Sequence, residues 1–412
     1  GDVSMICAEG ARNHGLLNVD TKGFFDEVTV DLPKSLEEQK RISAYLNALN
    51  HLITLHQRKC CELKKLKEYM ANHMFVNQSI KCDRNIATNH KKLQERTKKM
   101  GELESVIEQR LIDQLCGGDS QWTYRKDIRT EEQLWDNFKY ILEQNNKAKL
   151  NDMPLSESEF AKIKNDVSHA SFYDAGKWQV GENGKVYVHV QRGNETLHLV
   201  VMNNEHIAGG TSVYEVINQY QAFKTDEVDD KRNRRFDVTL LINGIPMIHI
   251  ELKNKDHSYM DGYRQIEKYI SEGKFRGLFS NVQMFVVSNA VDTKYFAAAR
   301  AAELAEGKKF ITGWVDEKNH PVCDYLDFAK AVLRIPQAHE MIAKYTVLDN
   351  EKKKLLILRP YQIHAIEAMR AASKRSISGY IWHTTGSGKT MTSYKATRNL
   401  LMDIPSIENI PD

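Results

Sequence analysis

Apolar residues in the first third of the chain follow a heptad rhythm. Over residues 42–74 they recur at alternating spacings of four and three, interrupted by His56 and Lys67, and the pattern begins after Pro33. Side chains repeating in this way share one face of a helix, and that face is usually buried against another helix. Residues 33–78 are therefore predicted to form one long helix of the coiled-coil type.

Shorter hydrophobic patterns follow residue 103. An amphipathic helix is predicted from residue 104 and should end at Gly117-Gly118, because glycine favours helix termini. Strands are expected at 186–190, 197–202, 213–220 and 282–288, and further helices at 134–142, 258–272 and 294–304. This mixture of strands and covering helices predicts an α/β fold.

The clearest local pattern is a hairpin over residues 236–253. Strand-forming residues stand on both sides of Asn243-Gly244, a pair that is typical of a tight type I′ turn. Successive side chains of a strand point to opposite faces, so Glu251 and Lys253 share one face of the second arm and apolar residues share the other. Asp237 lies on the first arm.

Ionised groups in an apolar strand are costly unless they are paired or bound to a metal. The carboxylates of Asp237 and Glu251, with Lys253 beside them, suit a hard cation such as Mg²⁺, while the lysine helps to place or activate water. For Glu-x-Lys alone, an exposed edge strand with an ordinary Glu/Lys pair is the alternative interpretation.

The register of the hairpin decides whether the two carboxylates meet. A strict two-residue loop sets Asp237 opposite Ile250, which leaves it on the wrong face. A one-residue bulge near Pro246, which cannot donate to a ladder, would set Asp237 opposite Glu251. We predict such a bulge, or a longer loop.

Composition changes this picture little. The chain has 412 residues, 41% of them hydrophobic, so it has room for two or three domains with proper cores. A formal charge of +3 is nearly balanced, and any nucleic-acid partner must be argued from local clusters. Six scattered cysteines favour a reducing cytoplasm over a zinc site. The sequence has no run of 18 apolar residues, so no membrane partner is expected.

Residues 79–103 form a boundary in composition. They are rich in lysine and arginine and poor in large apolar residues, so they are predicted to be a mobile basic linker. Met100-Gly-Glu then precedes a new amphipathic pattern, as if an independent reading frame began there. This start-like pattern leads to the hypothesis that two neighbouring subunits of one protein complex are joined here. The chain begins with Gly rather than Met, which indicates a fragment.

The central hairpin resembles a nuclease core. Asp237, thirteen intervening residues and Glu251-x-Lys253 resemble the PD-(D/E)xK pattern, and Gln265 to Tyr269 is similar to the Gln-x-x-x-Tyr element of its RecB-like branch. The resemblance implies that Asp237 and Glu251 bind the metal and that Lys253 serves the attacking water. It implies that Gln265 and Tyr269 support the site or the DNA backbone.

Two further features could belong to such a site. An early helix of this fold often lends a carboxylate to the metal, and Glu108 is the candidate here, with an ordinary exposed helix glutamate as the alternative. The basic residues before the hairpin would contact phosphate or form a solvated loop. They are Lys231, Arg232, Arg234 and Arg235.

A second motif lies near the C-terminal end. Residues 383–390, His-Thr-Thr-Gly-Ser-Gly-Lys-Thr, follow a strand-like stretch at 379–382 and precede a helix. Such a loop turns backbone N–H groups toward phosphate, while its lysine reaches the terminal phosphates and its last threonine can bind Mg²⁺. The expected ATP-binding residues are Thr385, Gly386, Ser387, Gly388, Lys389 and Thr390. The segment resembles superfamily 2 helicases, which implies that Gln362 recognises adenine.

Longer resemblances extend over most of the chain. Residues 103–412 resemble the N-terminal part of the type I restriction endonuclease (R) subunit through Ala170-Ser-Phe-Tyr-Asp-Ala-Gly, Gly209-Gly-Thr-Ser-Val-Tyr-Glu and the hairpin. Residues 1–78 resemble the C-terminal end of a type I specificity subunit through Leu36-Glu-Glu-Gln-Lys-Arg and Leu52-Ile-Thr-Leu-His. These resemblances imply double-stranded DNA, specificity subunits and methyltransferase subunits as partners.

The sequence thus predicts an α/β protein with a PD-(D/E)xK nuclease core, the start of a RecA-like helicase lobe and a long N-terminal coiled-coil helix. The expected domains are a remnant of a target-recognition domain at 1–32, the helix at 33–78, the linker at 79–103, the nuclease at 104–345 and the incomplete helicase lobe at 346–412. The expected function is Mg²⁺-dependent DNA cleavage, coupled in the full complex to ATP-driven translocation. The alternatives are a non-enzymatic DNA-binding or assembly module and an ATP-binding regulatory fragment.

Overall fold

The computed structural model describes residues 104–118, 120–181, 184–204, 207, 210, 212–222, 233–306, 311–384 and 386–403, without the side chains of 306 and 401–403. The chain divides into two compact units, Gly1–Glu95 and Arg96–Asp412, and all described residues belong to the second. The predicted coiled-coil helix and basic linker lie outside the described residues.

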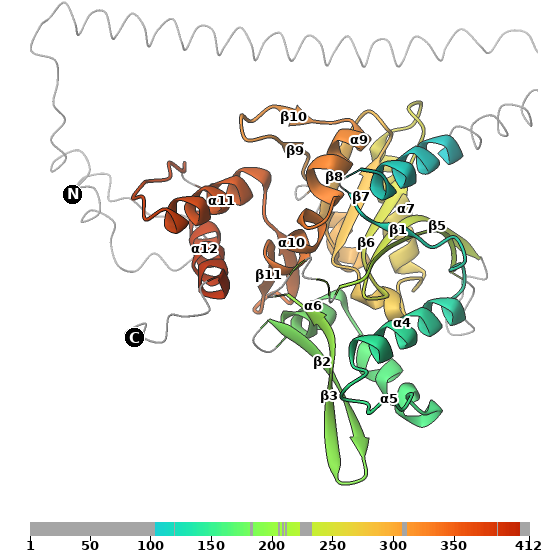
Figure 1. Cartoon of the computed structure of the whole chain (residues 1–412). Coiled ribbons are helices and arrows are strands. Elements are labelled where there is room, and N and C mark those ends of the chain that lie inside the picture. The colour runs from blue at the N-terminus through green and yellow to red at the C-terminus, as the bar shows by residue number, and fades with distance from the viewer. Residues whose placement is uncertain are drawn as a thin grey trace, which may run out of the picture. The chain divides into compact units, whose positions relative to one another are not determined.

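A six-stranded mixed sheet organises the second unit (Figure 1). Its order is β1 (Thr123–Tyr124), β4 (Tyr214–Ala222), β5 (Arg234–Ile242), β6 (Ile245–Leu252), β7 (Met284–Ser288) and β8 (Thr293–Ala297). The pairs β1/β4 and β6/β7 are parallel and the other three are antiparallel. The predicted hairpin is therefore the β5/β6 pair at the middle of the sheet.

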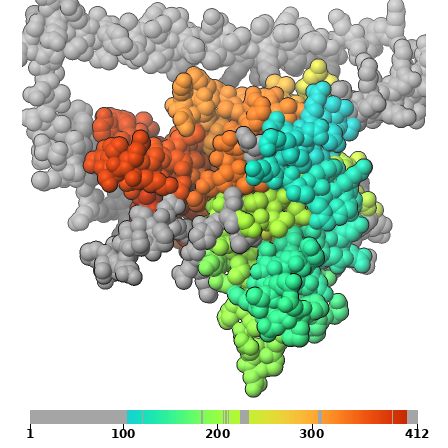
Figure 2. Space-filling view, in the orientation of Figure 1, coloured from blue at the N-terminus to red at the C-terminus, as the bar shows by residue number. Residues whose placement is uncertain are grey.

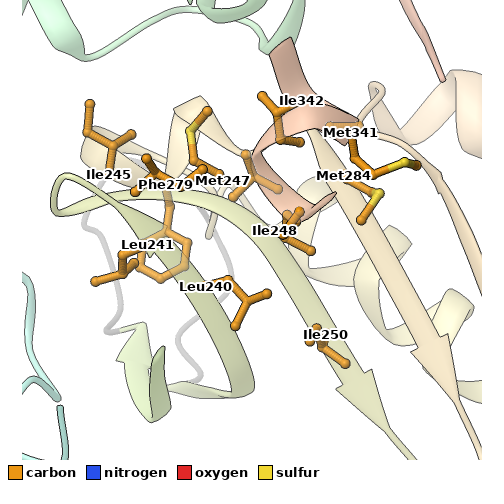
Figure 3. Packing of buried hydrophobic residues seen from close by; sticks show 14 of the residues in the cluster. Leu240, Leu241, Ile245, Met247, Ile248, Ile250, Phe279, Met284, Met341 and Ile342 are labelled. Atoms are coloured by element: carbon orange, nitrogen blue, oxygen red, sulfur yellow. The ribbon is translucent and has the colours of Figure 1, made fainter. Parts of the chain in front are cut away.

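The hydrophobic core includes these central strands. Every residue of β6 and β7 is buried, as a strand covered on both faces requires. Leu240, Ile248 and Met284 lie close to Met341 and Ile342, which come from the later helix α10 (Gln337–Ala343), as Figure 3 shows. Any charged side chain on these strands is consequently held in an apolar surrounding.

Helices cover this sheet as the hydrophobic patterns predicted. The first helix spans residues 104–116 and ends before Gly117-Gly118. Helix α4 (Glu131–Asn145) starts at a Thr130 capping box and buries its apolar stripe, and α7 (Tyr259–Ser271) starts at a Ser258 capping box. Because β6 and β7 are parallel, α7 is the crossover that joins them, and this brings it beside the charged end of β6.

The remaining elements surround this core. The hairpin of β2 (Lys185–Arg192) and β3 (Glu195–Asn203) forms a separate sheet that projects from the body (Figures 1 and 2). The others are α5 (Glu157–Val167), α6 (Phe172–Val180), η3 (Gly277–Asn281), α8 (Ala301–Glu306), β9 (Trp314–Val315), β10 (Pro321–Val322), α9 (Tyr325–Phe328), the π-helical turn η5 (Ala329–Leu333), β11 (Thr346–Asp349), β12 (Lys354–Ile357), α11 (Pro360–Lys374) and α12 (Lys389–Asp403).

Two sequence predictions fail. The alanine-rich stretch 294–304 is not one helix, because its first part is the edge strand β8, which pairs with β7 and buries Tyr295 and Phe296. Sheet pairing outweighs the helix propensity of alanine here. The predicted strand at 379–382 is not formed either. Among the described residues no strand pairs with it, and the side chains of Tyr380 and Trp382 are 89% and 87% exposed.

Candidate functional site

A one-residue bulge sets the register of the central hairpin. Leu240 pairs with Ile248, but the next residue, Leu241, pairs with Pro246, so Met247 is left without a partner on β5. Asn243 and Gly244 have positive φ angles of 51° and 77°, as a type I′ turn requires. The predicted bulge near Pro246 is confirmed.

The bulge brings Asp237 and Glu251 to the same face of the hairpin. Val238 pairs with Ile250, so Asp237 and Glu251 are the next positions along the two strands. The Asp237 Oδ2 atom accepts a hydrogen bond of 2.8 Å from the backbone N–H of Leu252. The charge of Glu251 raises the pKa of Asp237, whereas a side-chain hydrogen bond with Asp237 lowers the pKa of Glu251.

Lys253 completes the charged cluster. Its Nζ atom lies 3.1 Å from Glu251 Oε1 and 3.0 Å from the carbonyl oxygen of Leu252. Burial lowers the pKa of Lys253, but the carboxylates of Glu251 and Asp237 outweigh that effect and raise it above its usual value. The lysine is therefore a fixed positive charge, and its side chain remains 13% exposed while that of Glu251 is fully buried.

The two carboxyl groups hold their protons unusually tightly. Burial, followed by the charge of Glu251, raises the pKa of Asp237 to about 8. Burial also raises the pKa of Glu251 to about 7, against the opposing effect of Lys253. Two acids side by side in an apolar surrounding resist carrying two negative charges. A bound cation would relieve both the burial and the repulsion.

Glu108, the third carboxylate predicted for the metal, lies near this pair but has other partners. It is buried on the first helix, and its two oxygens accept hydrogen bonds of 2.6 Å from the side-chain amides of Asn218 and Gln219. Burial raises the pKa of Glu108 to about 7, and the charge of Asp237 contributes. Both oxygens would have to leave or share these amides in order to join a cation.

Helix α7 brings Gln265 and Tyr269 to the same site. Gln265 Nε2 donates to the Tyr269 hydroxyl at 2.5 Å, and that hydroxyl donates to the carbonyl oxygen of Arg235 at 3.5 Å. Burial and the nearby Glu251 raise the pKa of Tyr269. The helix packs against β6 at Gly262, where a Cβ atom would meet Glu251 Cγ at 3.5 Å, an ordinary van der Waals contact.

The basic residues before the hairpin differ in their surroundings. Arg234 pairs with Glu272 and lies 5.8 Å from the centre of the Tyr269 ring, so its charge is engaged within the fold. Arg235 is exposed and can meet a phosphate. Lys231 and Arg232 lie outside the described residues.

Sequence reasoning missed His249. It stands two residues before Glu251 on the same strand, so the two side chains share a face. The ring is fully buried, and burial lowers the pKa of His249 to about 4, which keeps the imidazole neutral. The strand alternation that places Glu251 and Lys253 on one face also places His249 there, so it could have identified His249 from the sequence.

The carboxylate pair fits a divalent cation, although the fit is incomplete as the side chains stand. Within the part of the chain that the structure describes, no three His, Cys, Asp or Glu side chains already surround a metal position. However, Glu251 Oε2 is buried and has no hydrogen-bond partner. An unpaired buried carboxylate oxygen beside a second carboxyl group is the donor chemistry that Mg²⁺ prefers. Asp237 and Glu251 are therefore the residues that would hold it.

The glycine-rich segment near the end of the chain forms a loop before a helix. Gly386 and Gly388 have φ angles of 77° and 80°, and α12 starts at Lys389, the residue after the loop. Gln362 Nε2 donates to the carbonyl oxygens of Ser387 at 3.3 Å and Gly388 at 3.4 Å. Lys389 and Thr390 are exposed, while Thr385 lies outside the described residues.

Two family models match this chain. Residues 101–303, which include the carboxylates, Lys253 and α7, match the model described as Type I restriction enzyme R protein N terminus. Residues 355–405, which include Gln362 and the glycine-rich loop, match the model described as Type III restriction enzyme, res subunit. Neither match covers residues 1–78, so their likeness to a specificity subunit stays a prediction.

Individual relatives are named as endonuclease subunits of type I restriction enzymes. The chain is 32% identical over 299 residues to the type I restriction enzyme SsaAORF53P endonuclease subunit of Staphylococcus saprophyticus, and 31% identical over 300 residues to the SauCOLORF180P subunit of Staphylococcus aureus. Each alignment covers 72% of this chain and 30% of the relative. The EcoprrI endonuclease subunit of Escherichia coli is 32% identical over 163 residues, which are 39% of this chain and 51% of that protein.

The chain is thus similar to endonuclease subunits of restriction systems. The chain spans about 30% of the length of the staphylococcal relatives. Among the described residues, no helix combines the length and apolar character needed to cross a bilayer.

Proposed function

We propose that residues 104–345 are the nuclease domain of a type I restriction R subunit and that this domain hydrolyses DNA phosphodiester bonds. The observation that carries the proposal is the bulge in β6, with Asp237 and Glu251 on one face beside Lys253. Neighbouring acids whose pKa values are raised by burial, as those of Asp237 and Glu251 are, are typical of catalytic sites. The family match over residues 101–303 supports the same assignment.

The residues of the site would take separate roles. Asp237 and Glu251 would hold Mg²⁺, which when bound polarises the scissile phosphodiester. Lys253, held by Glu251 and partly exposed, would direct the attacking water. Gln265 and Tyr269 would steady the strand end through the contact with the Arg235 carbonyl. Arg235 would meet the DNA backbone.

The C-terminal segment would begin an ATP-driven motor. Gln362 against the glycine-rich loop, with Lys389 at the start of α12, is an arrangement that suits the adenine and phosphates of ATP. In the whole protein, cleavage would then be coupled to ATP-driven translocation. The partners would be double-stranded DNA and the specificity and methyltransferase subunits of the same system, in the cytoplasm.

Metal binding tests this proposal better than DNA cleavage does, because cleavage also depends on the motor. We would titrate Mn²⁺ into the 412-residue chain with a short DNA duplex present, and measure the heat of binding for the wild type, Asp237→Ala and Glu251→Ala. Both substitutions are expected to abolish binding. Glu132→Ala, which removes an exposed glutamate of α4, is the control and should bind as the wild type does.

If both alanine variants bind Mn²⁺ as the wild type does, the carboxylates are structural and the proposed nuclease function is wrong. A non-enzymatic assembly module would then be the better assignment. If binding is lost only in the two site variants, the nuclease assignment holds.

A further inference from the structure

A line of polar side chains runs behind the proposed metal site. Thr239 on β5 and His249 on β6 are register partners, and His249 and Glu251 share a face of β6. All three side chains are buried, at exposures of 1%, 0% and 0%. Polar groups in such a place need a reason, since apolar residues would pack the same space without a desolvation cost.

The two nitrogens of His249 point along this line. Its Nδ1 atom lies 3.1 Å from Thr239 Oγ1, within hydrogen-bond distance. Its Nε2 atom lies 3.5 Å from Glu251 Oε2. In the described structure these last two atoms have no hydrogen-bond partner, and both are buried. His249 Nε2 and Glu251 Oε2 therefore face each other, and neither has another hydrogen-bond partner.

Packing fixes the imidazole ring. Its centroid lies 4.8 Å from that of Phe236, 5.5 Å from Phe275 and 6.1 Å from Phe285. Surrounded by these rings, His249 cannot swing its Nε2 atom elsewhere without displacing the core. The position of Nε2 beside Glu251 is thus set by the fold.

We propose that His249 is the positioning residue of the metal site: its Nε2 atom faces Glu251 Oε2 and fixes the carboxyl group, while that oxygen keeps its second lone pair for the cation. This inference rests on the proposed nuclease function and adds a residue to it. Polar partners behind a metal-binding carboxylate commonly fix its orientation, and their loss weakens metal binding. A small movement of the Glu251 carboxyl group would close the 3.5 Å separation to a hydrogen bond.

Two substitutions separate positioning from packing. His249→Phe keeps an aromatic ring among Phe236, Phe275 and Phe285 but removes both nitrogens. His249→Gln loses the ring but offers an amide that can donate to or accept from Glu251 in either orientation. A merely structural histidine would be replaced best by phenylalanine, and a positioning histidine by glutamine.

The measurement is the Mn²⁺ dissociation constant of the full chain with a short duplex, together with the melting temperature of each variant. For His249→Phe we expect about ten- to hundredfold weaker binding, the usual range for loss of a partner behind a metal ligand. His249→Gln should recover most of the affinity even if its melting temperature is the lower of the two.

His339 provides a matched control. It is also fully buried, and its nitrogens contact Tyr214 and Asn204 rather than a carboxylate of the site. His339→Phe should lower the melting temperature without changing the Mn²⁺ dissociation constant. This separates loss of a buried histidine in general from loss of the contact to Glu251.

Wild-type affinity in His249→Phe would overturn the inference, and so would equal losses in the Phe and Gln variants. Failure of the proposed function gives another pattern. The wild type would then bind no Mn²⁺, or Asp237→Ala would bind it normally, and His249 would have no metal ligand to position.

Discussion

Two buried glutamates of the central sheet have opposite surroundings. Glu215 on β4 accepts hydrogen bonds at both oxygens, from Arg125 Nη1 at 2.6 Å and from Asn137 Nδ2 at 2.7 Å. Glu251 on β6 has Lys253 at one oxygen and no hydrogen-bond partner at the other. Both side chains are almost wholly hidden from solvent, at 4% and 0% exposure.

The difference shows that burial of an acid does not by itself mark a functional site. Both carboxylate oxygens of Glu215 have hydrogen-bond partners within the fold, so we assign this residue a structural role. Glu251 and Asp237 are left with raised pKa values because their burial, and for Asp237 also the charge of Glu251, is not fully compensated. An acid whose partners are incomplete retains the capacity to bind a cation, and that capacity costs stability.

The largest expected effect comes from making the same change at both glutamates. Glu215→Gln puts an amide between Arg125 and Asn137 and leaves a buried donor without an acceptor, so it should lower the free energy of unfolding by about 3 kcal/mol. Glu251→Gln replaces an acid whose pKa is about 7 and whose Oε2 atom has no hydrogen-bond partner, so it should lower that free energy by much less. Urea denaturation at pH 7 without added metal measures both. Equal losses would erase the contrast between the two sites.

A smaller effect is expected from pH. In the unfolded chain Asp237 loses its proton near its usual pKa of 3.8, whereas in the folded chain it keeps the proton up to about pH 8. Between these values the folded state binds more protons, so stability should fall as pH rises. The Asp237 side chain is only partly buried, so solvent screens part of this effect. Asp237→Asn should remove most of the slope and stabilise the metal-free protein by about 2 kcal/mol at pH 8.

Denaturation midpoints of the wild type and Asp237→Asn between pH 5 and pH 9 test this prediction. The curves should converge at low pH and separate at high pH. A variant that is less stable than the wild type at pH 8 would contradict the assignment of Asp237 as an uncompensated acid.

The smallest effect concerns the exposed glycine-rich loop, which contrasts with both buried sites. Lys389 is exposed, so Lys389→Ala should leave the free energy of unfolding unchanged. Its loss should weaken binding of a fluorescent ATP analogue in the presence of Mg²⁺ by about tenfold, because the lysine reaches the terminal phosphates. Mn²⁺ affinity at the Asp237 site should stay as in the wild type. Unchanged analogue binding would argue against nucleotide recognition by this loop.

Local patterns in the sequence were sufficient for much of the fold around the site. The helix at 104–116, helices α4 and α7 and strand β7 follow from hydrophobic periodicity and capping residues. The hairpin turn follows from Asn243-Gly244. The bulge was predicted from the spacing between Asp237 and Glu251 and from Pro246, which cannot donate to the ladder. These features depend on residues close together in the chain, whose effects can be judged one segment at a time.

The two wrong predictions concern segments whose structure depends on distant residues. Residues 294–297 form a strand because they pair with β7. Residues 379–382 form none, and no described strand pairs with them. Strand formation depends on a partner that the local sequence does not specify. Alanine content and apolar runs could therefore not decide either segment.

The sequence by itself determined that Asp237, Glu251 and Lys253 lie on a hairpin, because strand alternation and turn chemistry are local properties. Only the tertiary structure decided which buried acids have complete partners. The amides that bind Glu108 come from residues 110 and 111 positions away, and the arginine that binds Glu215 comes from 90 positions away. Hydrogen bonds act across space rather than along the chain, so the packing of distant strands distinguishes a structural carboxylate from a candidate metal ligand.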